Sequence, residues 1–395
     1  MAAKLRKKHK LRRWMLVLLI LSAVSLVLFL VFWRWHYAVS HSFPDELAAD
    51  RWGDAADTSQ IDVFFSVDAP ITPDSFLYAE HMLETELENA GITPPEDSNA
   101  DLYKSAYCAT GKVYLNNKTN NIEVKALGVS GDYFYFHPVD LISGSVFSPE
   151  DINDDYVLLD QTSAWQLFGG TDIAGQILEC GGRTLIIRGV YRQREDKLAK
   201  AAGLDTPLVF VGYDTLVNTG VSYGINSYEI VMPNPIRDFA LTNVKKQLGM
   251  DDVYAQFVDV TGRFGILPGI QTLKNFTVRC MNSKAIIYPY WENVSRALEN
   301  RCALLLIPTG LFLLLAVLFF LIPLLYTWNH KGWKLQEQIP VWIGRIRDRI
   351  YTARVNRAQK KLHVSSSDHA ADETSHSNKS KGRGRRRGSS KEEEV

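Results

Sequence analysis

The sequence predicts an α+β domain held outside a membrane between two transmembrane α-helices. Three observations predict this fold class. The chain contains two long runs without a formal charge, at residues 14–33 and 303–327. Between them, residues 40–300 carry 36 acidic and 19 basic residues. This middle stretch alternates short strand-like and helix-like patterns, so the even balance of 44 basic and 44 acidic residues in the whole chain hides regions of opposite charge.

The first apolar run is predicted to be a membrane anchor. Its 20 residues are long enough to cross the hydrocarbon core of a bilayer. Residues 1–13 before it form a basic tail with seven Lys or Arg residues and no acid. A cleaved secretory signal has the same order, but its apolar part is usually shorter, about 7–15 residues. Trp33 at the end of the run and Trp35 just after it form an interfacial belt, which favours an uncleaved helix.

The second apolar run is predicted to cross the membrane as well. Pro308, Gly310 and Pro323 are tolerated in a membrane helix because neighbouring helices satisfy the freed backbone groups. From residue 328 to the end the chain carries 16 basic and 8 acidic residues. Because Lys and Arg are retained on the cytoplasmic side, both termini are predicted to be cytoplasmic and residues 40–300 extracytoplasmic.

Two strand–helix units lie far apart in the middle stretch. Residues 61–67 have the pattern of a strand, and a helix is expected from Pro73 to a stop at Gly91. Residues 228–232 have the pattern of a second strand, followed by a helix that ends at Gly249. This repetition predicts either two α+β lobes or one split α+β domain with the intervening segment inserted into it.

The intervening segment is predicted to be rich in strands. Its expected strands include residues 103–109, 112–115 and 122–129. Residues 177–180 and 184–187 flank Gly181 and Gly182, which predicts a β-hairpin.

The four cysteines predict neither a zinc site nor a dense disulfide framework. Cys108, Cys180, Cys280 and Cys302 are widely spaced and form no CxxC pair. Buried free thiols are expected. One bridge, Cys108–Cys180 or Cys180–Cys280, remains an alternative.

Residues 128–196 carry an ordered series of short motifs. The first is VSGDYF at 129–134, and the second is GSVFSPED at 144–151. They are followed by VLL at 157–159, AWQLFG at 164–169, IAGQI at 173–177 and IRGV at 187–190. In this order the motifs resemble the MacB-like periplasmic core domain of FtsX/MacB-type ABC transporter permeases. The resemblance implies a two-lobed external domain and a helix at 290–301 that continues into the second membrane span.

These motifs have structural explanations. Unusual φ angles are expected at Gly144, Gly169, Gly175 and the pair Gly181 and Gly182. Core positions are expected for Phe134, Phe147, Leu167 and Phe168.

No catalytic, cofactor-binding or metal-binding residue is predicted, and the protein is not expected to be an enzyme. The chain lacks a GxxxxGK[ST] phosphate loop and an HExxH motif. The stretch GVSGD at 128–132 lacks the second glycine of a GxSxG nucleophile elbow.

The resemblance implies a membrane permease-like subunit of an ABC-type transport or mechanotransmission complex in a bacterial cell membrane. Its external domain would bind a substrate or partner protein, and another chain would hydrolyse ATP. The expected partners are an ABC ATPase, a full-length permease or a second copy of this chain; an extracytoplasmic protein, peptide or lipid ligand is also open. Permeases of this family have three spans after the domain, and one is present here. The alternative is therefore an ATP-independent envelope scaffold or interaction protein.

The C-terminal region predicts two cytoplasmic segments. Residues 328–363 form a basic amphipathic segment, and residues 364–395 form a disordered tail. One face of the amphipathic segment is predicted to contact the anionic inner leaflet, although packing on a partner fits the same pattern. The contact residues are Ile339, Trp342, Ile343, Ile346 and Ile350, with Arg345 and Arg349. No recognised nucleic-acid-binding fold accompanies the basic residues, so nucleic-acid binding is not predicted.

Overall fold

The computed structural model describes residues 2–52, 58–93, 101–149, 151, 155–279, 285–331, 347–349 and 351–352. The chain divides into a domain unit, Ile20–Val317, and a terminal unit made of Met1–Leu19 and Leu318–Val395. In the terminal unit, Trp14 packs edge to face on Tyr326 with 5.5 Å between ring centres. The domain unit holds every described strand.

Two described helices are long and apolar enough to cross a membrane. They lie in α1 (Ala2–Ser40) and α11 (Tyr290–Lys331), and they run from Arg13 to Ser40 and from Tyr290 to Asn329. Few residues of their most apolar parts are buried, whereas the core helix of a soluble protein is mostly buried. The helix predicted at residues 290–301 is continuous with the apolar run in α11, as the resemblance implies.

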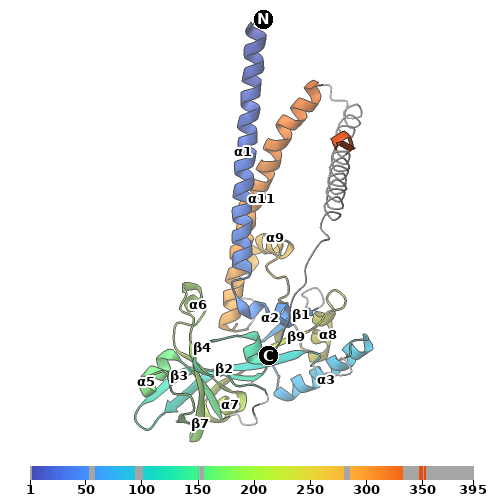
Figure 1. The fold of residues 1–395 in the computed structure, drawn as a ribbon. Coiled ribbons are helices and arrows are strands. Elements are labelled where there is room, and N and C mark those ends of the chain that lie inside the picture. Colours follow the sequence, from blue (N-terminus) through green and yellow to red (C-terminus); the bar gives the residue numbers. More distant parts are fainter. Residues whose placement is uncertain are drawn as a thin grey trace, which may run out of the picture. The chain divides into compact units, whose positions relative to one another are not determined.

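One sheet forms the centre of the domain unit (Figure 1). The order of its strands is β10-β1-β9-β2-β3-β8-β5-β7-β4, and β6 pairs with β2 and β7. The strands are β1 (Thr58–Phe65), β2 (Lys104–Asn116), β3 (Asn121–Gly131), β4 (Asp140–Gly144), β5 (Tyr156–Asp160), β6 (Ile177–Cys180), β7 (Arg183–Arg192), β8 (Leu208–Gly212), β9 (Val221–Pro233) and β10 (Ala255–Asp259). The shorter helices are η1 (Pro44–Glu46), α2 (Ala48–Trp52), α3 (Pro73–Asn89), α4 (Tyr133–Phe136), α5 (Gln161–Phe168), α6 (Lys197–Ala201), α7 (Tyr213–Thr219), α8 (Phe239–Leu248), α9 (Ile266–Lys274) and α10 (Phe276–Arg279).

The half-sheet β10-β1-β9-β2 is a doubly split βαβ arrangement. The crossover β1-α3-β2 leaves room for β9 between its strands, and the crossover β9-α8-β10 leaves room for β1. The strands β3 to β8 lie between β2 and β9 in the sequence and extend the same sheet through the pairing of β2 with β3. Of the two predicted alternatives, the structure shows the split domain with an inserted segment. The two lobes share one continuous sheet.

Successive side chains of β1 point to opposite faces of the sheet and so contribute to two different layers of the core. Ile61, Val63 and Phe65 pack with α3 and α8, while Gln60 and Phe64 face the other layer, which contains η1 and the segment before α11. The second lobe has its own apolar core beneath α5 and α7. The helices α3 and α8 end where predicted, because glycines with positive φ follow them at Gly91 and Gly249.

Some local predictions need correction. The residues predicted as two strands, 103–109 and 112–115, form the single strand β2, with register shifts against β9 around Ala109 and Gly111. Among the predicted core residues Leu167 is fully buried, but Phe134, Phe147 and Phe168 are only partly buried at the margins of the core.

Three of the four cysteines are buried free thiols. These are Cys108, Cys180 and Cys302, so the alternative Cys108–Cys180 bridge is not formed. Cys280 lies outside the described residues.

Two glycines at left-handed turns provide a matched test of this architecture. Gly144 and Gly169 both have positive φ, 76° and 71°, as the sequence predicts. A Cβ at Gly144 would lie 2.2 Å from the carbonyl oxygen of Arg188, whereas a Cβ at Gly169 would meet nothing within 4 Å. We expect Gly169→Ala to cost about 1 kcal/mol and Gly144→Ala about 3 kcal/mol, because only the second adds a backbone clash. Urea unfolding of the full chain in detergent measures both, and equal costs would contradict the packing at Gly144.

Candidate functional site

Two acidic side chains are buried on one face of the sheet, near the base of the long helices. Asp62 in β1 and Glu229 in β9 are direct cross-strand partners, and each residue is 2% exposed. Opposed like charges in a sheet are destabilising, and a buried charge requires a partner. Neighbouring segments supply these partners.

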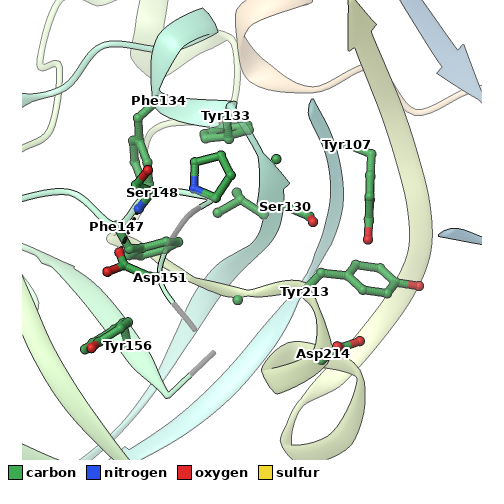
Figure 2. A pocket seen from close by; sticks show the side chains of 14 residues that line it. Tyr107, Ser130, Tyr133, Phe134, Phe147, Ser148, Asp151, Tyr156, Tyr213 and Asp214 are labelled. Atoms are coloured by element: carbon green, nitrogen blue, oxygen red, sulfur yellow. Dashed lines mark hydrogen bonds between the residues drawn. The ribbon is translucent and has the colours of Figure 1, made fainter. Parts of the chain in front are cut away.

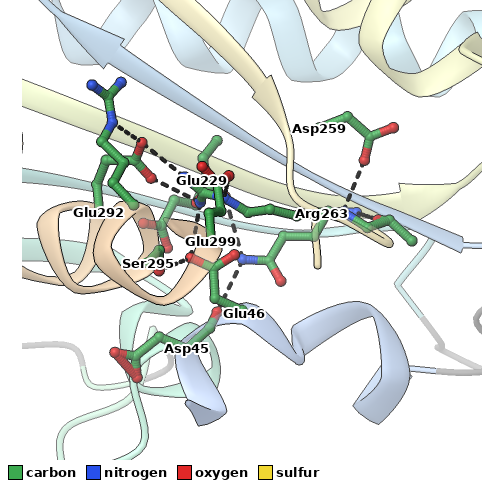
Figure 3. Close-up of polar contacts among 12 residues, drawn as sticks. Asp45, Glu46, Glu229, Asp259, Arg263, Glu292, Ser295 and Glu299 are labelled. Carbon is green, nitrogen blue, oxygen red and sulfur yellow. Dashed lines mark hydrogen bonds and ion pairs between the residues drawn. The ribbon is translucent and has the colours of Figure 1, made fainter. Parts of the chain in front are cut away.

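Arg263 is the centre of a buried charge cluster (Figure 3). Its side chain is 4% exposed, and its Nη1 lies 3.0 Å from Glu46 Oε1 and 2.8 Å from Glu292 Oε2. Its Nη2 donates to Glu292 Oε1 at 3.0 Å, and its Nε donates to Glu299. One guanidinium group thus binds a carboxylate of η1 and two carboxylates of α11. Arginine suits this position because its planar group presents five donors in a fixed geometry.

Further contacts tie α11 to the same cluster. Ser295 Oγ donates to Glu46 Oε1. Arg296 Nε donates to Glu292 Oε1 at 2.6 Å, and the Arg296 guanidinium lies 3.7 Å from the ring centre of Tyr288. Because Glu292 accepts from two arginines, the first turns of α11 are held by charge-assisted hydrogen bonds.

Gln60 ties the segment after α1 to β1. Its Nε2 donates to the carbonyl oxygen of Asp45 at 3.1 Å and to Asp62 Oδ1 at 3.3 Å. Its Oε1 accepts from the backbone N–H of Ala48 at 3.1 Å. The turn η1 and the start of α2 are therefore fixed to the sheet by one buried amide.

Burial and mutual charge shift the pKa values of this cluster. Burial raises the pKa of Glu46 to about 7, although the charge of Arg263 acts in the opposite direction. Burial and the nearby charge of Glu229 raise the pKa of Asp62 well above its usual value, which favours its neutral form. Burial alone would lower the pKa of Arg263, but the charges of Glu292 and Glu46 raise it, so the guanidinium stays charged.

His137 supplies a second positive charge on the same face. Its Nε2 lies 2.9 Å from Glu229 Oε2, and its Nδ1 lies 3.5 Å from Asp45 Oδ2. Its ring centre is 4.3 Å from that of Trp291 and 4.5 Å from that of Tyr133. Burial alone would lower the pKa of His137, but the negative charges of Glu229 and Asp45 raise it to about 10. His137 is therefore a cation at neutral pH.

The cluster joins both long helices to the sheet. Asp45 and Glu46 follow α1 after a short turn, and Glu292 and Glu299 lie in the first turns of α11. Moving either helix away from the sheet would separate buried charged partners, which is costly in a site of low dielectric. The arrangement is suited to transmitting movement. Within the described part of the chain, no group of three or more His, Cys, Asp or Glu side chains is arranged to hold a metal ion.

A cleft of about 290 Å³ is a second candidate site (Figure 2). Phe134 and Phe147 meet edge to face at 5.0 Å on one side, and Tyr107 and Tyr213 meet at 5.2 Å on the other. The first two quoted sequence motifs converge here, through Val129, Ser130, Gly131, Tyr133 and Phe134 and through Phe147, Ser148, Pro149 and Asp151. An aromatic wall with a few polar groups can bind a peptide or small organic group.

The predicted contact in the basic C-terminal segment falls almost entirely outside the described residues. The residues outside are Ile339, Trp342, Ile343, Arg345, Ile346 and Ile350. Arg349 belongs to a short described helical stretch, 347–349, and is exposed. The membrane-surface or partner contact stays a prediction.

Sequence patterns did not predict the charge cluster because its members are dispersed. Arg263 and Glu46 are 217 positions apart. One local signal was present, since Asp62 and Glu229 are single acids within the apolar strands IDVFF and YEIVM. Such a residue needs a buried partner, so it can indicate a polar cluster before the fold is known.

Comparison with known proteins gives one family and several solved structures. Residues 53–257 match the family described as the MacB-like periplasmic core domain. The chain is similar to the periplasmic region of MacB from Actinobacillus actinomycetemcomitans, with 13% identity, 57% of this chain and 94% of that chain covered, and a TM-score of 0.36. It is also similar to the extracellular domain of the noncanonic ABC-type transporter YknZ from Gram-positive bacteria, with 14% identity, coverages of 50% and 99%, and a TM-score of 0.33. No curated protein matches the chain.

Proposed function

The chain belongs to the family of MacB-like periplasmic core domains, and from this membership we propose that it is a permease-like subunit of an ABC-type transport or mechanotransmission complex. The family consists of external domains of membrane permeases and is not an enzyme class. In this proposal another chain hydrolyses ATP. The partners are an ABC ATPase, a full-length permease or a second copy of this chain.

The observation that carries the proposal is the attachment of both long helices to one buried cluster. Arg263 binds Glu46 behind α1 and Glu292 in α11, and Gln60 holds the η1 backbone on β1. A shift of the helices would reach the sheet through these contacts. This is the property that a mechanical relay between a membrane and an external domain requires.

The cleft between the two family motifs is the proposed contact site for a substrate or partner. Its aromatic pairs, Phe134 with Phe147 and Tyr107 with Tyr213, offer apolar contact area beside hydroxyl groups. The cleft and the charge cluster lie on the same sheet. Binding of a substrate or partner in the cleft and movement of the long helices can therefore influence each other through the strands.

Co-purification tests the proposed complex. The full chain is purified from bacterial membranes in mild detergent, with an unrelated two-span protein of equal abundance as the control. Specific recovery of an ABC ATPase or a permease supports the proposal. Repeated recovery of neither would overturn it and favour the ATP-independent envelope scaffold.

We expect the β2–β3 turn to lie outside the cell membrane and the C-terminal tail inside. Thr119 is exposed in this turn, and Ser377 lies in the tail. A membrane-impermeant maleimide added to intact spheroplasts should label Thr119→Cys, while Ser377→Cys should react only after lysis. The unsubstituted chain is the control. Labelling of Ser377→Cys with protection of Thr119→Cys would reverse the proposed orientation.

Residues 339–350 are the proposed cytoplasmic contact with the anionic leaflet or with a partner. Ile339, Trp342 and Ile343 would supply its apolar side, and Arg345 and Arg349 its charge.

A further inference from the structure

A short helix that follows the charge cluster packs along α11. Helix α9 begins three residues after Arg263, whose Nε donates to Glu299 of α11. Farther along α9, a Cβ on Gly269 would lie 2.5 Å from Leu306 Cδ1. The chain from Arg263 to Gly269 therefore runs along α11 towards its apolar run, and Figure 1 shows α9 beside that helix.

On the side of α9 turned away from α11, three apolar residues are exposed beside Gln271 and Lys274. Leu267 is 74% exposed, Ile266 48% and Ile270 39%. The following helix α10, which contacts α9, also exposes Val278, at 72%, and Phe276, at 43%. Single exposed apolar side chains are ordinary, but five of them on two short, neighbouring helices point to a contact surface. We call these five residues the α9–α10 patch.

The contacts between the two long helices show which part of α1 lies beside the part of α11 that α9 packs on. Ser22 Oγ donates to the carbonyl oxygen of Ala316 at 2.8 Å, and Phe32 stacks on Phe312 at 5.6 Å. These contacts show that α1 and α11 run antiparallel within the domain unit. Residues of α11 that precede Phe312, including Leu306, consequently lie level with residues of α1 that follow Phe32.

That part of α1 carries exposed aromatic residues. Trp33 is 42% exposed, Trp35 55% and Tyr37 52%. Exposed Trp and Tyr side chains at the end of an apolar helix are typical of a membrane–water interface. On α11 at the same level, Leu304 and Ile307 are 53% and 55% exposed, so the apolar surface of the span continues towards α9.

We propose that the α9–α10 patch binds the outer headgroup region of the same bilayer that the two long helices cross. This inference rests on the proposed two-span topology. Interfacial helices insert their apolar side about 5–10 Å into the boundary between headgroups and acyl chains, at the level where aromatic belts lie. The exposed Lys274 at the end of α9 can meet lipid phosphate. The bilayer then holds the domain at a third point besides the two long helices. This third attachment is a segment that follows Arg263 directly in the chain.

Spin-label accessibility in lipid tests the proposal. The full chain, with its four cysteines replaced by alanine, carries a nitroxide at Leu267→Cys and is reconstituted in nanodiscs of phosphatidylethanolamine with a minor share of phosphatidylglycerol. Leu77→Cys, on an exposed face of α3, is the aqueous control, and Leu314→Cys, in the apolar run of α11, is the hydrocarbon control; these leucines are 65% and 62% exposed. Collision with oxygen is compared with collision with a water-soluble nickel chelate.

We expect the oxygen-to-nickel ratio at Leu267→Cys to be severalfold higher than at Leu77→Cys and below that at Leu314→Cys. An aqueous ratio at Leu267→Cys, with a hydrocarbon ratio at Leu314→Cys, would overturn the interfacial contact and leave the two-span topology standing. Shielding from both reagents, or spin–spin coupling between copies, would show that protein covers the patch and would also overturn it. An aqueous ratio at Leu314→Cys would instead refute the two-span topology together with this inference.

Discussion

Arg263→Met should destabilise the external domain by about 3–5 kcal/mol, because it leaves buried carboxylates without their shared cation. Glu46 and Glu299 each contact this guanidinium, and Glu292 contacts it through both oxygens. Methionine fills much of the space but offers no hydrogen-bond donor. The measurement is the rate at which a thiol reagent labels the buried Cys108 in the full chain in detergent. That loss should accelerate labelling roughly 150- to 4,000-fold, since about 1.4 kcal/mol corresponds to a factor of ten.

A matched control separates the buried cluster from the general effect of removing an arginine. Arg237 pairs with Asp238 at the surface, where its side chain is 94% exposed, and such pairs contribute little. Arg237→Met should therefore leave the labelling rate of Cys108 unchanged. Adding Glu46→Gln to Arg263→Met should recover part of the lost stability, since it removes one uncompensated acid. Labelling of Arg263→Met at the unsubstituted rate would show that the cluster does not hold the domain together.

Local periodicity was sufficient to predict the elements that depend on local sequence. The helix after Pro73, the helix before Gly249 and the turn at Gly181 and Gly182 all follow from capping residues, apolar spacing or positive φ. The division of β2 into two strands, 103–109 and 112–115, was wrong because Gly111 lies inside one continuous strand. A Cβ there would lie 2.4 Å from the carbonyl oxygen of Val221, so this glycine allows close packing inside the sheet.

Long-range pairing could not be predicted in the same way. The insertion of β3 to β8 between β2 and β9 was one of two alternatives, and only the strand register distinguishes them. The charge cluster depends on the same pairing. Asp62 and Glu229 become opposed only when β1 pairs with β9, and Arg263 reaches Glu292 only because α11 returns to this face. Asp62 and Glu229 were therefore recognisable in the sequence as acids within apolar strands, but their buried partners could not be identified from it.

The stability of the external domain should fall as the pH rises from about 7 to 9, with a slope of up to about 1.4 kcal/mol per pH unit from His137. The pKa of His137 is raised from 6.5 to about 10 in the folded chain. The folded state thus keeps a proton that the unfolded state releases, and the contribution is complete below pH 6.5 and lost as the pH approaches 10. Glu46 also binds its proton more tightly in the folded chain, where its pKa is raised to about 7. That proton stabilises the fold at acidic pH, and most of this stabilisation is already lost at pH 7.

His137→Gln isolates this proton from the other groups of the cluster. Glutamine can still hydrogen-bond to Glu229 but carries no charge, so the variant should be less stable at pH 7 and should lose most of the slope between about pH 7 and 9. His81→Gln is the control, because the His81 side chain is 77% exposed and faces Glu84 at 3.8 Å. Denaturant unfolding across this pH range gives both slopes. The same steep slope in His137→Gln as in the unsubstituted chain would assign the proton to another group and refute the charged contact between His137 and Glu229.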